Sequence, residues 1–282
     1  MSKTVLLMGA TGGVGAEAGR MLVAGGYHVI ATCRKQQQAD ELVASKLCHV
    51  ALLMDLADND SIDSVFAEMT RMGVPSLAAI VNCAAVLSGA PLEIVSAREV
   101  EGIFRANVFG TLRVVQLAIP LLRPDRGRII LVGSLAGSFV MPLTGAYSAS
   151  KFALEGLCDG LRRELYPWGI QVSLIKPGAI DTRMYQAHLE DVDRNLKRKM
   201  TGVEALYRPL YAAHALSIPK TRKMAVSTER VASYVITALE VKRAKARYYP
   251  SLESKLVRYL TPIMPDTWLD RFAAKVFPLD RG

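Results

Sequence analysis

The chain has 282 residues, of which 51% are hydrophobic and 22% are charged, and its formal net charge is +9. This composition excludes an intrinsically disordered chain and is sufficient for the core of one large α/β domain. The longest apolar region, 77–95, is interrupted by Asn82, Gly89 and Pro91, so we expect no transmembrane helix. The N-terminus leads directly into an apolar run without a visible targeting signal, so we expect a cytoplasmic protein.

The excess positive charge gathers in two places, 194–199 (with Arg183 nearby) and 220–281. Aromatic stacking platforms and base-reading motifs do not accompany it, so we predict no nucleic-acid partner and favour a phosphate-bearing cofactor as the anion. The four cysteines occur singly and the four histidines lack metal-ligand spacing. We therefore predict reduced core thiols of an intracellular protein and no metal site.

Strands and helices alternate along the chain. Residues 4–8 form an apolar run, and a glycine-rich turn, a helix ending at Gly25-Gly26 and a strand over 27–33 follow, which together predict a βαβ unit. We expect further helices over 36–44, 61–72, 97–122 (bent or ended near Pro120), 146–166 and 228–241, and further strands over 48–54, 77–81, 128–132, 171–175 and 247–249. Because the strands are almost continuously apolar, they predict one doubly wound α/β domain with a parallel sheet covered on both faces.

The first turn of this pattern has glycines at Gly9, Gly13 and Gly15. Glycines between a strand and a helix let backbone N–H groups approach a pyrophosphate, so we predict a dinucleotide site, although the spacing differs from the GxGxxG fingerprint. The second strand ends in Arg34-Lys35 with no acidic residue, which favours NADP(H) over NAD(H), with Arg34 as the main ligand of the 2′-phosphate. An ordinary solvated basic loop is the alternative.

Candidate catalytic side chains lie at Ser134, Tyr147 and Lys151. The serine follows an apolar strand, and the tyrosine and lysine lie one turn apart on a helix. A tyrosine has a pKa near 10, but an ammonium about 5 Å away is worth roughly 3 kcal/mol and would lower that pKa by about two units. We therefore predict acid–base chemistry on a carbonyl or alcohol; a surface pair is the alternative for this spacing taken alone.

These motifs together resemble the short-chain dehydrogenase/reductase family, from residue 3 to about 182. The shared positions are Gly9, Gly13 and Gly15, Asp55-Leu56, Asn82-Cys83-Ala84-Ala85, Asn107, Ser134, Tyr147 with Lys151, and Pro177-Gly178 with Thr182. The sequence departs from the family pattern at Met8, where a threonine is usual, and at Cys83 and Ala85, where the family has asparagine and glycine.

The resemblance implies a Rossmann-like fold and a role for each matched position. Tyr147 would exchange the proton, Lys151 would hold the nicotinamide ribose and lower the tyrosine pKa, Ser134 would bond the reacting oxygen, and Asn107 would anchor a water. The implied cofactor contacts are Gly9, Thr11, Gly12, Gly13, Val14, Gly15, Arg34, Lys35, Asp55, Leu56, Asn82, Ala84, Tyr147, Lys151, Pro177, Gly178, Ile180 and Thr182. Substrate would contact Ser134, Tyr147 and Tyr185.

By the same resemblance we divide the chain into a catalytic domain over 1–250, with a substrate-covering segment over 179–226, and a basic amphipathic tail over 251–282. Tyr185, Leu189, Tyr207 and Tyr211 either wall an apolar pocket or cover the end of the sheet. The residues Arg194, Lys197, Arg198 and Lys199 are most simply a solvated helix face, with an anionic substrate group as the alternative.

The tail has Trp268, Leu269, Phe272, Val276 and Phe277 at helical spacing, with Lys255, Arg258, Arg271 and Lys275 as its basic residues. It either docks on the protein or a subunit, which we favour, or lies on an anionic membrane. Pro262 and Pro265 limit it to short helices.

We predict an NADP(H)-dependent oxidoreductase that interconverts an alcohol and its ketone or aldehyde. The resemblance favours a lipophilic substrate such as a steroid or retinoid, and a homodimer or homotetramer paired through the helices near 97–122 and 146–166. A reductase of 3-oxoacyl or small ketone substrates, and a non-catalytic NADP(H)-binding scaffold protein, are the alternatives.

Overall fold

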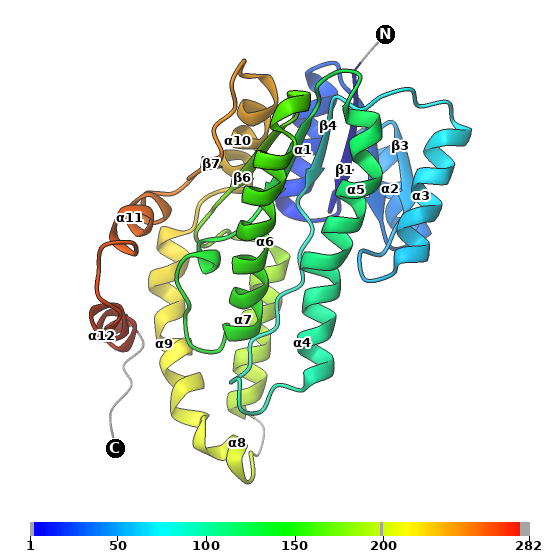
Figure 1. Cartoon of the computed structure of the whole chain (residues 1–282). Helices are drawn as coiled ribbons and strands as arrows, with labels where there is room; N and C mark the ends of the chain where they lie inside the picture. The colour runs from blue at the N-terminus through cyan, green and yellow to red at the C-terminus, as the bar shows by residue number, and fades with distance from the viewer. Residues whose placement is uncertain (1–2, 198–199, 277–282) are drawn as a thin grey trace.

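A computed structural model describes residues 3–197 and 200–276 (Figure 1). Three positions named above, Arg198, Lys199 and Phe277, lie outside this range. Within it, seven strands form one parallel sheet in the order β3-β2-β1-β4-β5-β6-β7. The strands are β1 (Thr4–Met8), β2 (His28–Cys33), β3 (Val50–Leu53), β4 (Ala79–Asn82), β5 (Arg128–Val132), β6 (Gln171–Ile175) and β7 (Arg247–Tyr248). The predicted doubly wound parallel α/β fold is confirmed.

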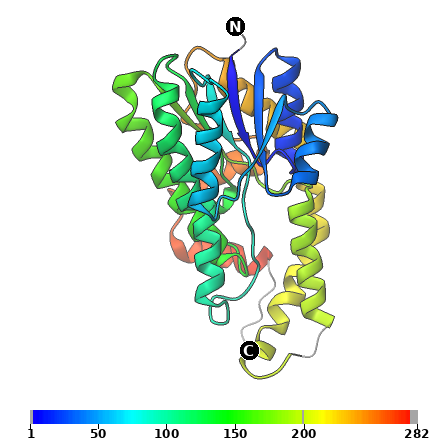
Figure 2. The same cartoon turned by 90° about the vertical axis from the view of Figure 1, so that its right-hand side faces the viewer.

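Helices cover both faces of the sheet (Figures 1 and 2). The helices α1 and α10 pack against each other on one face, and α3, α5 and α6 cover the other. The bounds are α1 (Gly13–Ala24), α2 (Gln36–Ala44), α3 (Asn59–Arg71), α4 (Ala97–Phe104), α5 (Thr111–Leu122), α6 (Gly145–Glu164), α7 (Arg183–Lys197), α8 (Val203–Leu206), α9 (Arg208–Met224), α10 (Thr228–Glu240), α11 (Leu252–Leu260) and α12 (Asp266–Val276).

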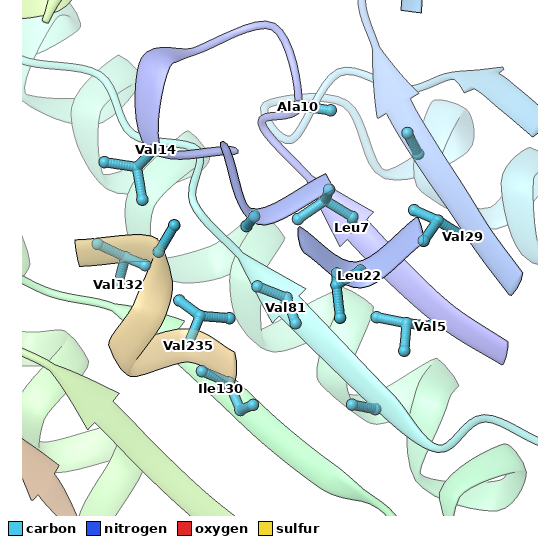
Figure 3. Close-up of a cluster of buried hydrophobic side chains, with 14 of the residues drawn as sticks. Val5, Leu7, Ala10, Val14, Leu22, Val29, Val81, Ile130, Val132 and Val235 are labelled. Atoms are coloured by element: carbon cyan, nitrogen blue, oxygen red, sulfur yellow. The ribbon is translucent and has the colours of Figure 1, made fainter. Parts of the chain in front are cut away.

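Two apolar clusters fill the space between the sheet and its helices. Because successive side chains of a strand point to opposite faces, Val5 and Leu7 of β1 belong to one cluster and Leu6 and Met8 to the other. Figure 3 shows the first cluster, where Leu22 of α1 and other side chains pack beside Val5 and Leu7. The near-continuous apolar strands of the sequence are thus explained by burial on both sides.

The long helix expected over 97–122 is interrupted. A π-helical segment, Arg105–Gly110, separates α4 from α5, and α5 ends at Leu122, just beyond Pro120. A Cβ added to Gly110 would lie 1.8 Å from the Leu56 carbonyl oxygen, so the backbone here lies against the loop after β3. In the sequence, Pro120 was the only sign of an irregularity. The irregularity lies instead where the helix meets that loop, and π-helical segments are frequent at functional sites.

The segment 179–226 forms α7, α8 and α9, and Figure 2 shows α7 and α9 running together beyond the sheet. A buried histidine pair joins them: the Nε2 atoms of His188 (α7) and His214 (α9) lie 3.1 Å apart. Burial lowers the pKa of His214 to about 4, and the neighbouring His188 acts in the same direction. Tyr211 packs in a small apolar cluster with Leu143.

This pair should make stability depend on pH. Well above pH 6.5 His214 is neutral in both folded and unfolded states, but as pH falls from there toward 4 the unfolded state takes up the proton first. We expect His214→Gln to unfold in urea with a smaller loss of stability between about pH 7 and pH 5 than the parent, by about 2 kcal/mol. Equal losses for the two proteins would contradict the assignment.

Candidate active site

The glycine turn lies at the carboxyl end of β1, beside the point where the strand order reverses between β1 and β4. Gly9 has φ +78°, and a Cβ there would lie 2.6 Å from the Ala84 nitrogen of the loop after β4. A Cβ on Gly15 would lie 2.0 Å from the Gly9 carbonyl oxygen. Both positions therefore require glycine, one for its left-handed conformation and both for close approach of backbone.

The first turn of α1 can receive an anion. Its N-cap residue, Gly12, makes no side-chain capping hydrogen bond and no acidic residue lies in the first turn. The first N–H groups of a helix have no partner within the helix, and the helix dipole favours negative charge at this end. The turn thus fits the pyrophosphate of a dinucleotide, with Thr11 and Val14 on either side of Gly12 and Gly13 in the chain.

Arg34 and Lys35 follow the end of β2 directly, and both are exposed. The Arg34 backbone N–H donates to Gln38 Oε1, and Lys35 is the N-cap of α2. Across the β2–β3 pairing, Asp55 and Leu56 follow β3, and the Asp55 carboxylate accepts from the Ala57 N–H. The two basic side chains and Asp55 therefore lie at the carboxyl ends of adjacent strands.

Two asparagines hold the loop after β4. Asn82 donates to Thr111 Oγ1 and accepts from the Ala84 N–H, both at 2.9 Å. Asn107, in the π-helical segment, accepts from the Val86 N–H at 2.8 Å and donates to the Val86 carbonyl. Since both asparagines are buried, these bonds satisfy amides that would otherwise destabilise the core.

Asn107 also reaches the helix that carries Tyr147. Its amide donates to Ser150 Oγ at 3.0 Å, and Ser150 in turn donates to the Tyr147 carbonyl. The π-helical segment and α6 are therefore joined through side chains at the turn that separates Tyr147 from Lys151. This chain of hydrogen bonds fixes the backbone of the turn rather than the phenol itself.

The side chains of Ser134, Tyr147 and Lys151 lie together: Ser134 interacts with the Tyr147 phenol and lowers its pKa, and the Lys151 amine lies beside the Tyr147 ring. Ser134 follows β5, while Tyr147 and Lys151 are buried on α6. The Lys151 Nζ donates to the Val132 carbonyl at 3.1 Å and lies 5.6 Å from the centroid of the Tyr147 ring. The predicted grouping of the three side chains is therefore present in the fold.

The expected lowering of the tyrosine pKa is wrong for the polypeptide by itself. Burial raises the pKa of Tyr147 to about 12, and the hydrogen bond with Ser134 opposes this only in part. Burial also lowers the pKa of Lys151 to about 8, so its positive charge is less firmly held than in water. Helical spacing accounts for the attraction between the ammonium and the phenolate, but the desolvation of both groups outweighs it.

The turn after β6 is the last of the loops at the carboxyl ends of the strands that carry predicted site residues. The Pro177 carbonyl accepts from the Leu135 N–H, next to Ser134, and Ile180 forms a parallel bridge with Val226. A Cβ on Gly13 would lie 3.6 Å from Thr182 Cγ2, so this turn approaches the glycine turn. Tyr185, one helical turn beyond Thr182, is half-buried, and burial raises its pKa. The predicted cofactor residues thus line one continuous edge.

An ion-pair network behind this edge was not predicted. Glu155 of α6 pairs with Lys176, the residue before Pro177, and accepts from Arg247 of β7 at 2.8 Å. Lys176 also donates to Ser138 in the loop after Ser134, and Arg247 contacts Asp159 at 3.0 Å. Two features of the sequence could have indicated this network: the four-residue spacing from Lys151 to Glu155 and a lysine, Lys176, at the end of an apolar strand.

We expect Glu155→Gln to lower the free energy of unfolding by about 3 kcal/mol, because two largely buried cations would lose their shared carboxylate. Chemical denaturation measures this. The matched control is Glu101→Gln on α4, which breaks an exposed pair with Arg105 at the start of the π-helical segment and should cost under about 0.5 kcal/mol. Equal effects of the two substitutions would show that the network is not structurally important.

A model of the short chain dehydrogenase family matches residues 3–193. The chain belongs to this family. It is therefore an oxidoreductase that uses a nicotinamide cofactor and acts on small molecules. Within the described part of this family member, no helix is long and apolar enough to cross a membrane.

Several relatives match along most of this short-chain dehydrogenase. The uncharacterised oxidoreductase YbbO of Escherichia coli is 31% identical, covering 96% of the chain and 94% of the relative. The NADPH-dependent 3-dehydrocapnine reductase of Ornithobacterium rhinotracheale is 28% identical, covering 96% and 95%. Human 11-beta-hydroxysteroid dehydrogenase type 2 is 30% identical, covering 98% of the chain and 71% of the relative.

The fold also matches solved structures of the family. A short-chain dehydrogenase from Streptomyces avermitilis superposes with a TM-score of 0.76 at 25% identity, covering 98% of this chain and 95% of that one.

Proposed function

We propose that this protein is an NADP(H)-dependent reductase and dehydrogenase that interconverts an alcohol and its ketone or aldehyde. The observation that carries the proposal is the grouping of Ser134 and the Tyr147 phenol beside the buried Lys151, at the same sheet edge as the glycine turn. A proton donor, a second hydroxyl and an anion-binding helix terminus on one edge suit carbonyl reduction.

Tyr147 is the proton donor in this proposal. Because the polypeptide holds the pKa of its phenol at about 12, the group stays protonated at neutral pH and can donate to a developing alkoxide. The Ser134 hydroxyl bonds the same oxygen and orients the carbonyl. Lys151, fixed by the Val132 carbonyl, adds positive charge beside the phenol and favours its ionised form when the proton leaves.

The glycine turn and the two neighbouring loops would hold the dinucleotide. The α1 N-terminus would bind the pyrophosphate and Asp55 with Leu56 would hold the adenine, while Asn82 and Asn107 keep the β4 loop in place. When bound, the nicotinamide supplies or accepts the hydride. Lys151 also suits the ribose hydroxyls, and Thr182 with Ile180 suits the carboxamide.

The preference for NADP(H) rests on Arg34 and Lys35. Both are exposed after β2, where an acidic residue would favour the unphosphorylated ribose, and no acid stands there. A relative whose name describes it as NADPH-dependent supports the same choice. NAD(H) is the alternative cofactor.

We expect Arg34→Ala to raise the KM for NADPH about tenfold or more while leaving the KM for NADH unchanged, since it removes a charged contact to the 2′-phosphate. Steady-state kinetics with both cofactors measures this. The matched control is Lys3→Ala, an exposed cation at the opposite end of β1. A lower KM for NADH than for NADPH, unaffected by Arg34→Ala, would refute the assignment.

For the substrate we propose a lipophilic alcohol or carbonyl, such as a steroid or retinoid. The similarity to a hydroxysteroid dehydrogenase and the half-buried Tyr185 at the start of α7 support it. A small ketone or 3-oxoacyl substrate is the alternative. Parallel assays of NADPH oxidation with steroids, retinaldehyde, acyl thioesters and simple ketones would distinguish these classes.

For the oligomeric state we propose a homodimer or homotetramer. The helices predicted to pair carry exposed aromatic residues, Phe109 in the π-helical segment and Phe152 on α6. Exposed aromatic side chains are common at subunit interfaces, which supports pairing through this surface.

We expect Tyr147→Phe to lower kcat about a thousandfold with NADPH affinity unchanged, because the variant keeps the ring but cannot supply a proton. Stopped-flow turnover and cofactor fluorescence titration measure the two effects. Tyr166→Phe, at an exposed tyrosine beyond α6, is the matched control. Undiminished turnover in Tyr147→Phe would refute the catalytic role, and NADPH binding by the parent without turnover on any carbonyl would favour the scaffold alternative.

A further inference from the structure

The two helices of the tail, α11 and α12, do not cover the sheet. Figure 1 shows them at the outer edge of the molecule, away from the helices that pack on either face. The loop between them contains Pro262 and Pro265, as the predicted short pieces require. The side chains that the two helices direct toward the protein and toward solvent therefore indicate what the helices can bind.

The inward side of α11 is polar. Ser251 and Ser254 are buried and cap the helix with reciprocal hydrogen bonds. Glu253, the only acidic residue of this helix, lies against the turn after β6, because its Oε2 atom would be 2.5 Å from a Cβ on Gly178. Burial raises the pKa of this carboxyl group. The inward side is thus anchored by two serines and a carboxylate, and Val257 is its half-buried apolar residue.

The outward side of α11 is apolar. Its exposed side chains follow helical spacing and continue into the loop: Leu252 (74% exposed), Leu256 (53%), Tyr259 (65%), Leu260 (43%) and Ile263 (76%). An ordinary surface helix buries such a stripe and exposes its polar side. The arrangement here is reversed, because these apolar side chains face away from the protein's own core.

The next helix extends the same kind of surface. Trp268 and Phe272 lie one turn apart on α12 and are 59% and 52% exposed. The Phe272 ring also contacts Phe139 edge-on, with centroids 6.0 Å apart, and Phe139 belongs to the loop that follows Ser134. The apolar surface therefore rests on the loop that carries a candidate catalytic side chain.

The charges on this surface indicate what would cover it. Lys255 and Arg258 are exposed on α11, and the guanidinium of Arg258 lies over the Tyr249 and Tyr259 rings at 5.0 and 5.2 Å. On α12, Arg271 and Lys275 are exposed together with two aspartates, Asp266 and Asp270. With Glu253 turned inward, the exposed charge of the two helices is positive, four cations against two carboxylates.

We propose that the outward face of α11 and α12 binds the surface of an anionic lipid bilayer. Apolar side chains flanked by tyrosine, tryptophan and long basic residues suit the interface, where apolar groups enter the acyl region and cations reach the phosphates. In a dimer with a two-fold axis this surface would lie against the same surface of the second copy, so the positive charges of the two copies would repel each other. The proposal concerns the tail and does not depend on the substrate.

Vesicle flotation of the full-length protein tests the proposal. We expect the protein to float with phosphatidylcholine vesicles containing about a third phosphatidylserine, and to bind pure phosphatidylcholine about tenfold less. The triple variant Leu256→Ser, Ile263→Ser, Trp268→Ser should lose at least about tenfold in partition. Lys255→Gln with Arg258→Gln should remove most of the difference between the two lipids, and so should high salt.

The control is Tyr166→Ser, which removes an exposed aromatic residue far along the chain from the tail and should float as the parent does. Melting temperatures equal to that of the parent show that each variant is folded. A parent protein that does not float, or a triple variant that floats equally well, overturns the proposal. Light scattering that shows the triple variant converting a parent dimer to monomers, without flotation of either, assigns the surface to a second copy.

Discussion

One face of helix α6 organises the candidate active site. Tyr147, Lys151, Glu155 and Asp159 follow one another at intervals of four residues, so the helix presents a phenol, an amine and two carboxylates in a row. The first two reach Ser134 and the Val132 carbonyl, and the last two reach Lys176 and Arg247. A single helical stripe thus joins the chemistry at the carboxyl ends of β5 and β6 to the ion pairs behind them.

The burial of this stripe sets the proton affinities. Removing a phenol and an amine from water makes both charged forms less favourable, so the tyrosine holds its proton more tightly and the lysine more loosely than in solution. Glu155 shows the other solution to burial, because it accepts two cations at once. The pair of Tyr147 and Lys151 and the ion-pair network occupy successive turns of the same helix.

The tail adds a second organising feature. Helix α11 uses Ser251, Ser254 and Glu253 to attach to the turn after β6 and leaves its leucines outside. Through Phe272 and Phe139, α12 touches the loop after Ser134. The two tail helices are therefore connected by direct contacts to two loops of the candidate site, so that binding at the tail surface would act on groups that touch these loops.

The sequence by itself determined the strand–helix alternation, the parallel sheet, the glycine turn and the one-turn spacing of Tyr147 and Lys151, because these follow from apolar periodicity, turn chemistry and helical spacing, all of which are local. The resemblance to the family added Ser134 to this group. Only the tertiary structure decided the direction of the Tyr147 pKa shift, the π-helical segment at Asn107, and the pairing of Glu155 with Lys176 and Arg247. It also decided which side of α11 faces solvent. Desolvation, close backbone contacts and pairings between distant segments depend on which parts of the chain meet, and no local pattern contains that information.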